Sequence, residues 1–339
     1  MRFSASAFAP ACASPNHCEA DPLRLYPDAS GGEAAVTRYR VFPGMELDYR
    51  DVHARACREL RDGSGERLEI HHCLEGRVEY RQNGRYFYLS PGDLAVARTS
   101  SLPPDSRFPT GHYHGITVTI DPAAAPECLS CILSDVEVRP ATLMEKLCPG
   151  RTVFTARSSR RVKHVFSELY AVPEDIRKGY FKVKLLELLL FLSTLSPEDG
   201  QTPHGCTAAQ VTLAEQVKAC LLAESDRTLT LKSLSQQFNV SEAQIKSSFT
   251  GVYGMSPASY ARSQRMHGAA ALLRETDRTV LDIACQFGYD NASKFARAFR
   301  DVIGVSPREY RAGAEYDSCA PQLGEKPVSL SDADVERRI

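Results

Sequence analysis

A chain of 339 residues is long enough for two domains, because one domain usually takes about 100–200 residues. The net charge of −1 and the isoelectric point near 6.8 exclude a uniformly basic protein, so any nucleic-acid surface must lie in one part of the chain. Residues 212–311 carry thirteen Lys and Arg against ten Asp and Glu, a net charge of +3, which leaves −4 for the rest of the chain.

The cysteines and the apolar runs indicate the cellular compartment of the protein. Eleven cysteines are scattered along the chain, and the sequence does not start with a basic stretch followed by an apolar one. A reduced, cytoplasmic location is therefore expected. The longest apolar run, at 185–195, contains Glu187 and is shorter than the about 20 residues that span a bilayer, so no membrane segment is predicted.

The first half of the chain is typical of a β-rich domain. Residues 1–35 mix Pro, Ala, Ser and Gly and predict an irregular N-terminal segment. From 36 onward, short runs rich in Tyr, Val, Ile and Phe alternate with turn residues, and Asn83-Gly84 between two such runs is a strong hairpin signal. We expect an antiparallel β-sandwich or small barrel.

Helical periodicity follows between 174 and 195. Apolar side chains at three-to-four spacing form a stripe that further leucines widen, and two interpretations stay open: packing onto the sheet, or pairing with the same helix of a second subunit. The stripe consists of Ile176, Tyr180, Val183, Leu186 and Leu190, widened by Leu185, Leu188, Leu189 and Leu192. The Pro, Gly, Ser and Thr of 196–210 predict a linker, so the first domain is expected over 36–195.

The remainder of the chain contains an internal repeat. Aligning Thr230 with Thr279 and allowing one inserted residue places Gly254 on Gly304 and Tyr260 on Tyr310. Each repeat reads as a short amphipathic helix, a turn and a second helix, which is the helix-turn-helix arrangement. We expect a second domain over 211–312 and a flexible tail over 313–339.

The second helix of each repeat carries a polar outer face, which suits the edges of bases in a DNA major groove. The candidate recognition residues are Glu242, Gln244, Lys246 and Ser247 in the first repeat and Asn291, Ser293, Lys294 and Arg297 in the second. The candidate phosphate contacts are Arg262, Arg265, Arg300, Arg308 and Arg311. Residues 256–276 between the repeats predict a stiff spacer helix. Two hairpins of a helical repeat scaffold are the alternative interpretation, although such scaffolds normally need three or more units.

The stretch DIACQFGYDNASKFARAFRDVIGVSPREYR, within 282–311, closely resembles the signature of the AraC/XylS family of bacterial transcription regulators. The resemblance covers about 212–311. It implies two helix-turn-helix units joined by a long helix, sequence-specific binding near promoters, and activation through contact with RNA polymerase. The first repeat departs from the pattern at Thr250, where Lys is common, and the joining helix departs from it at His267-Gly268.

The resemblance also implies an N-terminal cupin-like domain that senses an effector and forms a homodimer. The adjacent His71 and His72 point to opposite faces of a strand and cannot easily share a metal ion, whereas His112 and His114 share one face. Ordinary polar or pocket-lining histidines are therefore favoured over a metal site, and neither a metal nor a cofactor is predicted. The candidate effector pocket consists of His72, Tyr80, Tyr88, His112 and His114.

No motif predicts an enzyme. A nucleophile elbow, a dinucleotide fingerprint and a P-loop are all missing from the sequence. Cys128 and Cys131 form a C-x-x-C pair without a partner pair for zinc, which favours idle thiols over a redox sensor. Cys12 and Cys18 also lack partners, which disfavours a DNA-repair regulator with a zinc-bound cysteine.

These observations predict an α+β two-domain fold, with an N-terminal antiparallel β-sandwich or cupin-like barrel with helices and a C-terminal all-α double helix-turn-helix. The expected function is that of a sequence-specific transcriptional regulator, and the expected partners are double-stranded promoter DNA, RNA polymerase and a small-molecule effector. Two alternatives stay open. One is a cupin-type metal-binding protein or metalloenzyme with an appended DNA module, and the other is an adaptor whose repeats bind a protein.

Overall fold

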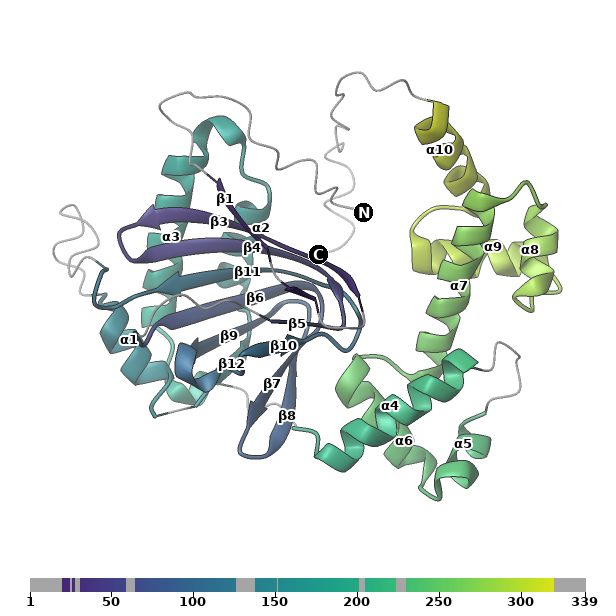
Figure 1. Ribbon diagram of the computed structural model, residues 1–339, viewed down its shortest axis with the longest axis horizontal. Coiled ribbons are helices and arrows are strands. Elements are labelled where there is room, and N and C mark those ends of the chain that lie inside the picture. The colour runs from purple at the N-terminus through teal and green to yellow at the C-terminus, as the bar shows by residue number, and fades with distance from the viewer. Residues whose placement is uncertain are drawn as a thin grey trace. The chain divides into compact units, whose positions relative to one another are not determined.

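The computed structural model describes residues 20–24, 26–27, 31–58, 65–125, 138–150, 152–200, 205–223 and 230–319 (Figure 1). These residues form two compact units. The first contains the described residues up to 220 together with 230–256, and the second contains 221–223 and 257–319. The cysteines of the C-x-x-C pair, Cys128 and Cys131, lie outside the described residues, as do Cys12 and Cys18.

An antiparallel sheet of seven strands organises the first unit, in the order β1-β3-β4-β11-β6-β9-β12 (Figure 1). Its strands are β1 (Ala20–Arg24), β3 (Gly32–Phe42), β4 (Met45–Ala54), β11 (Tyr113–Ile120), β6 (Leu68–Gly76), β9 (Asp93–Arg98) and β12 (Phe154–Arg157). A three-stranded sheet contains β10 (Asp105–Arg107), β5 (Ala56–Arg58) and β2 (Tyr26–Pro27). The hairpin of β7 (Val78–Gln82) and β8 (Arg85–Leu89) completes the set.

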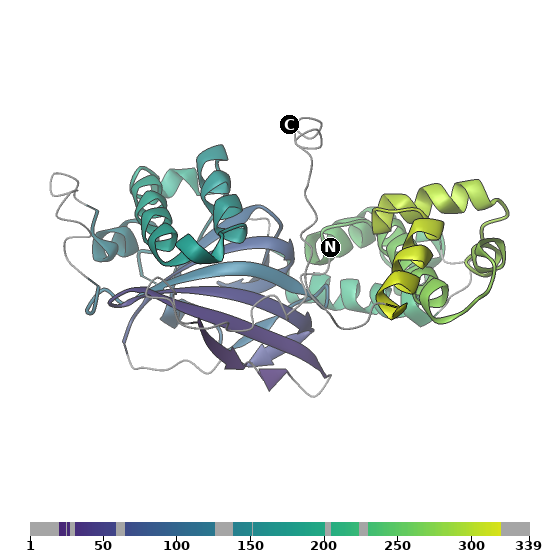
Figure 2. The same ribbon diagram turned by 90° about the horizontal axis from the view of Figure 1, so that it is seen from above.

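The two faces of the large sheet contact different layers. Helices cover one face, where the teal α2 (Arg160–Tyr170) and α3 (Arg177–Ser193) lie over the strands in Figure 2. Their apolar side chains join α1 (Pro140–Leu147) and Leu47, Ile70 and Val118 of the sheet in one buried cluster. The opposite face buries Val52, Cys73 and Ala95 against residues of the smaller sheets. Because successive strand residues face opposite sides, one strand supplies both layers.

The predicted hairpin is confirmed. Asn83 and Gly84 both have positive φ, 51° and 73°, as the two-residue turn between right-twisted strands requires. Tyr80 pairs with Phe87 across this hairpin.

Helix α3 buries a different face from the one that its three-to-four spacing marked. Phe181, Leu185 and Leu188 are fully buried against the sheet, whereas Ile176 and Val183 of the predicted stripe are 49% and 60% exposed. Because residues 185–192 of α3 are apolar except for Glu187, more than one set of positions fits a period of 3.6 and no unique stripe is marked.

The first repeat belongs to the first compact unit. Its helices are α5 (Leu231–Phe238) and α6 (Glu242–Tyr253), preceded by α4 (Ala208–Ala223). In this unit Arg77 donates to the carbonyl of Gly251 in α6 at 3.2 Å, and Lys218 of α4 donates to the carbonyl of Pro109 at 3.1 Å.

The second compact unit is helical and contains α7 (Pro257–Glu275), α8 (Val280–Gln286), α9 (Ala292–Ile303) and α10 (Pro307–Cys319). Its core is a buried cluster formed by Met266, Ala270, Ile283, Phe295 and Phe299. The predicted fold class is thus confirmed: antiparallel strands with helices in the N-terminal half, and helices alone in the C-terminal part. Among the described helices, none is long and apolar enough to cross a bilayer.

Candidate nucleic-acid interface

Side-chain caps define the first repeat. Thr230 caps α5 by accepting a hydrogen bond from the backbone N–H of Ser233 at 3.0 Å, and Ser241 caps α6 by accepting one from Gln244 at 3.1 Å. Between the helices, Asn239 adopts a left-handed conformation with φ of 52°. Helix α6 ends at Gly254, which is also left-handed.

The second repeat uses the same devices at the aligned positions. Thr279 caps α8 through the N–H of Asp282 at 3.1 Å, and Asn291 caps α9 by accepting from the N–H of Ser293 at 2.7 Å. Gly288 takes the turn with φ of 84°, and Gly304 ends α9 with φ of 94°. Both turns thus need a residue that tolerates positive φ, which Gly and Asn do best.

Both second helices bury one side and expose a polar one. In α6, Ile245 and Phe249 are fully buried, as are Phe295 and Phe299 in α9. All eight candidate recognition residues are exposed, namely Glu242, Gln244, Lys246, Ser247, Asn291, Ser293, Lys294 and Arg297. Exposed Lys, Arg, Gln and Ser on one helix face can reach base edges and phosphates.

Two of these residues also have structural tasks. The Asn291 side chain is occupied as the cap of α9. Glu242 is the first residue of α6, where a carboxylate stabilises the helix dipole but would repel a phosphate.

The arginines proposed to contact phosphates differ in whether other residues already engage their guanidinium groups. Arg262 of α7 lies 3.6 Å from Asp301 of α9, and Arg300 lies 4.0 Å from Glu309, while Arg308 is exposed. Arg311 donates to the carbonyls of Leu273 and Arg278, which occupies its guanidinium inside the second compact unit.

Arg265 is half-buried, and its Nε atom is enclosed without a hydrogen-bond partner among the described residues. An enclosed guanidinium has less freedom to reach a phosphate than the exposed Arg300 and Arg308.

The residues predicted for an effector pocket lie in different surroundings. His72 faces helix α2, where its ring stacks on Phe166 at a centroid distance of 4.1 Å. Burial there, and to a smaller extent the charge of Lys163, lower the pKa of His72 to about 4. Tyr88 donates to Glu79 at 3.1 Å, and burial followed by this carboxylate raises the pKa of Tyr88.

Tyr80 lines a cavity on the other side of the sheet from His72. The cavity is bounded also by Arg50, His71, Phe108 and Tyr113 and has a volume of about 20 Å³, which is room for about one water molecule. His71 lies 3.2 Å from Glu69 and 3.1 Å from Thr117. The opposite orientations predicted for His71 and His72 are confirmed.

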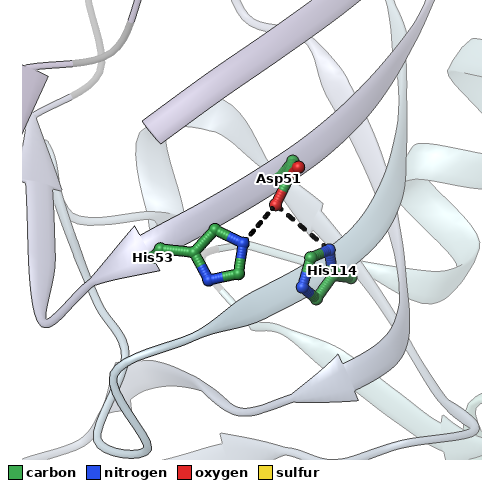
Figure 3. Close-up of side chains that lie close together, drawn as sticks. All are labelled: Asp51, His53 and His114. Carbon is green, nitrogen blue, oxygen red and sulfur yellow. Dashed lines mark ion pairs between the residues drawn. The ribbon is translucent and has the colours of Figure 1, made fainter. Parts of the chain in front are cut away.

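His112 and His114 lie at the end of the sheet, with ring centroids 6.5 Å apart. Burial lowers the pKa of His112, and the neighbouring His114 lowers it further. Two residues that the sequence analysis passed over, Asp51 and His53, are the close neighbours of His114 (Figure 3). Their alternation on one strand was visible in the sequence, but the pairing of that strand with the strand of His114 was not.

Two tandem helix-turn-helix units with polar second helices define a DNA-binding protein. A family model described as a helix-turn-helix domain matches residues 234–313. An uncharacterized HTH-type transcriptional regulator from Escherichia coli K12, YdiP, is 35% identical over 275 residues, which cover 77% of this chain and 88% of that protein. The chain belongs to the AraC/XylS family of transcriptional regulators.

Other relatives are more distant. The arabinose operon regulatory protein of Salmonella typhimurium is 24% identical over 71% of this chain and 82% of its own. A crystal structure of a probable AraC family regulator from Rhodopseudomonas palustris is 30% identical, covers 30% of this chain and 97% of its own, and has a TM-score of 0.29. The protein is therefore a DNA-binding transcriptional regulator, as its curated relatives are.

Proposed function

We propose that this regulator activates transcription by placing α6 and α9 in two adjacent major grooves of promoter DNA, under the control of its N-terminal domain. The observation that carries the proposal is the exposed polar face present at aligned positions of both second helices. A major groove admits one helix, and successive grooves on one face of B-DNA are about 34 Å apart. Gln244, Lys246 and Ser247 read one groove, and Lys294 and Arg297 read the next.

The joining helix supports this arrangement. Helix α7 has 19 residues, and at 1.5 Å per residue it is about 28 Å long. A continuous helix of this length connects the repeats along the chain as a stiff spacer. The exposed Arg300 and Arg308 contact phosphates, which position the helices without specifying the sequence.

Control through the N-terminal domain is supported by contacts inside the first compact unit. Arg77 follows β6 directly, is half-buried, and donates to the Gly251 carbonyl in α6, near the end of the first recognition helix. A change in the sheet that displaces Arg77 therefore alters the support of α6. Such coupling requires a ligand that binds one arrangement more tightly than the other.

The proposed effector is a small organic molecule in the sheet domain. The cavity beside Tyr80 holds about one water molecule, whereas organic ligands occupy about 300–1,000 Å³. The effector therefore binds a conformation in which the side chains around the cavity beside Tyr80 have moved apart and the cavity is larger. The proposed domains are 36–195 for sensing and dimerisation and 211–312 for DNA binding, joined by 196–210. The active species is proposed to be a homodimer that recruits RNA polymerase in the cytoplasm.

The first test is a fluorescence-anisotropy titration of the full-length protein on the intergenic DNA upstream of its own gene. We expect saturable binding that resists scrambled competitor DNA and weakens between two salt concentrations, because phosphate contacts release counterions. Lys294→Ala should weaken this binding, whereas the control Lys178→Ala, an exposed lysine of α3, should not. Salt-insensitive binding, or equal affinities for the two variants, would contradict the proposal.

Activation is tested separately. Transcription in vitro with purified RNA polymerase from the same promoter should increase on adding the protein, and sedimentation should give the mass of a dimer. A decrease in transcript would identify a repressor instead.

A further inference from the structure

Three side chains that could hold a metal ion meet at one end of the large sheet (Figure 3). Asp51 and His53 are alternate residues of β4 and therefore point to the same face. His114 of β11 is the direct cross-strand partner of Asp51 in the antiparallel register. Directly opposed residues have side chains on one face of the sheet and close together, so the strand pairing itself assembles the group.

The distances suit one ion. Oδ1 of Asp51 lies 3.0 Å from Nε2 of His53 and 3.2 Å from Nδ1 of His114. The ligand atoms of the three residues all lie within 4.8 Å of one another. In a tetrahedral site with bonds of about 2.0–2.2 Å, ligand atoms are about 3.4 Å apart. Small side-chain rotations are enough to bring all three atoms to that separation.

Among the described residues, the groups that face Oδ1 of Asp51 are the imidazoles of His53 and His114, which pair with the carboxylate only when they are protonated. This Oδ1 atom is enclosed from water and accepts no hydrogen bond from the described part of the chain, although two imidazole nitrogens lie close to it. An enclosed carboxylate oxygen left in this state is costly. A cation bound between the oxygen and the two nitrogens would remove that cost and use a lone pair of each ring.

We propose that Asp51, His53 and His114 bind one divalent transition-metal ion of the zinc type. Two imidazoles and one carboxylate suit Zn²⁺, Co²⁺ or Fe²⁺, whereas Mg²⁺ and Ca²⁺ prefer all-oxygen ligands. Three protein ligands leave a coordination position for water or a small anion.

Solvent reaches the ion from the side of His53, because the side chain of His53 is 56% exposed. The side chain of His114, at 16% exposed, lies on the protein side of the site. The site is separate from the buried His71 and His72, and it extends the proposed function without depending on it.

The test uses full-length protein freed of metal with a chelator and titrated with Co²⁺, without DNA. We expect one equivalent to bind, with visible absorption bands and no intense near-ultraviolet band from sulfur-to-cobalt charge transfer, and Zn²⁺ should displace it. Asp51→Asn and His114→Gln should weaken binding at least about tenfold, since even changes to residues behind a ligand cost about 10–100-fold. The control His164→Gln changes an exposed histidine of α2 and should bind like the wild type.

Three results would overturn the inference: no stoichiometric Co²⁺ binding, unchanged affinity in Asp51→Asn and His114→Gln, or a sulfur charge-transfer band that assigns the ion to cysteines. Far-ultraviolet circular dichroism checks that the variants fold. His53→Gln provides a second variant with little risk to the core, because its side chain is more than half exposed. Since the measurement contains no DNA, its failure leaves the proposed DNA binding untouched.

Discussion

At three aligned positions of the second helices, the first repeat has Gln244, Ser247 and Thr250 where the second has Lys294, Arg297 and Arg300. All six side chains are exposed. The two backbones share their caps, their left-handed turns and their final glycines. The caps and the core thus preserve one fold in both repeats, while the charge of the outer face varies independently.

The two repeats also differ in what they pack against. The first lies in the compact unit that contains the sheets, where Arg77 and Lys218 make hydrogen bonds between helices and sheet segments. The second lies in the other unit and buries its own helices against α7. We therefore expect the first repeat to respond to changes in the sheet and the second to behave as an independent DNA-binding element.

Removing a buried aromatic ring from the core of either repeat should destabilise the protein most. Phe249→Ala and Phe299→Ala remove aligned, fully buried rings, and each should destabilise its own unit by about 3–5 kcal/mol. Hydrogen exchange should show lost protection over 231–254 in the first variant and over 280–311 in the second. Loss of protection in both repeats from either single change would show that the repeats unfold together.

The charge difference predicts unequal contributions to DNA binding. Arg297→Ala should weaken specific binding by about 1–3 kcal/mol if the guanidinium reads a base, and the aligned Ser247→Ala should cost less. Anisotropy titrations on specific and scrambled DNA measure both. Equal weakening on the two DNAs would mean that Arg297 touches phosphate alone, and an equal loss for Ser247→Ala would remove the asymmetry.

Acid should weaken the unit that contains the first repeat. The pKa of His72 is about 4 in the folded chain against an ordinary value of 6.5, so the unfolded state binds more protons between these values. The stability that this histidine contributes is complete above about pH 6.5 and is lost as the pH falls toward 4. Between pH 7 and pH 5 the loss is about 2 kcal/mol.

Denaturant unfolding at several pH values measures this loss, and His72→Gln should flatten the dependence. A wild-type slope that persists in His72→Gln would assign the effect to other groups.

The smallest stability changes are expected for alanine substitutions of Gly254 and Gly304, the glycines that end α6 and α9. Gly304→Ala places a side chain at φ of 94° in open space and should cost about 1 kcal/mol through backbone strain. Gly254→Ala carries the same strain at φ of 76°, and its new Cβ would also lie against the guanidinium of Arg77. It should therefore cost more, and urea denaturation compares the two. Equal costs would show that Arg77 moves aside freely.

The helical part was readable from the sequence because its signals are local. The repeat was revealed by three aligned pairs, Thr230 with Thr279, Gly254 with Gly304 and Tyr260 with Tyr310, once one inserted residue was allowed. Local rules also assigned His71 and His72 to opposite faces, since alternation along one strand needs no knowledge of its neighbours.

The sites of the sheet domain were harder to predict from the sequence, because they are assembled from residues that lie far apart along the chain. Asp51 meets His114 only through the pairing of β4 with β11, which no local pattern encodes. The predicted effector residues were chosen by type, and the structure distributes them between the α2 side of the sheet, the small cavity and the sheet end. For α3, an excess of leucines made the buried face ambiguous.

The strand order of the large sheet has a consequence for shortened forms of the protein. At one edge of this sheet, β1 covers the eleven-residue strand β3, and its Pro22 has no N–H to offer a further strand. Removing residues 1–24 would leave unpaired backbone groups along Ala35–Tyr39 of β3. Such a fragment should associate with copies of itself through strand addition. The five residues of β1 therefore protect the protein from aggregation by occupying the backbone hydrogen-bonding groups of β3.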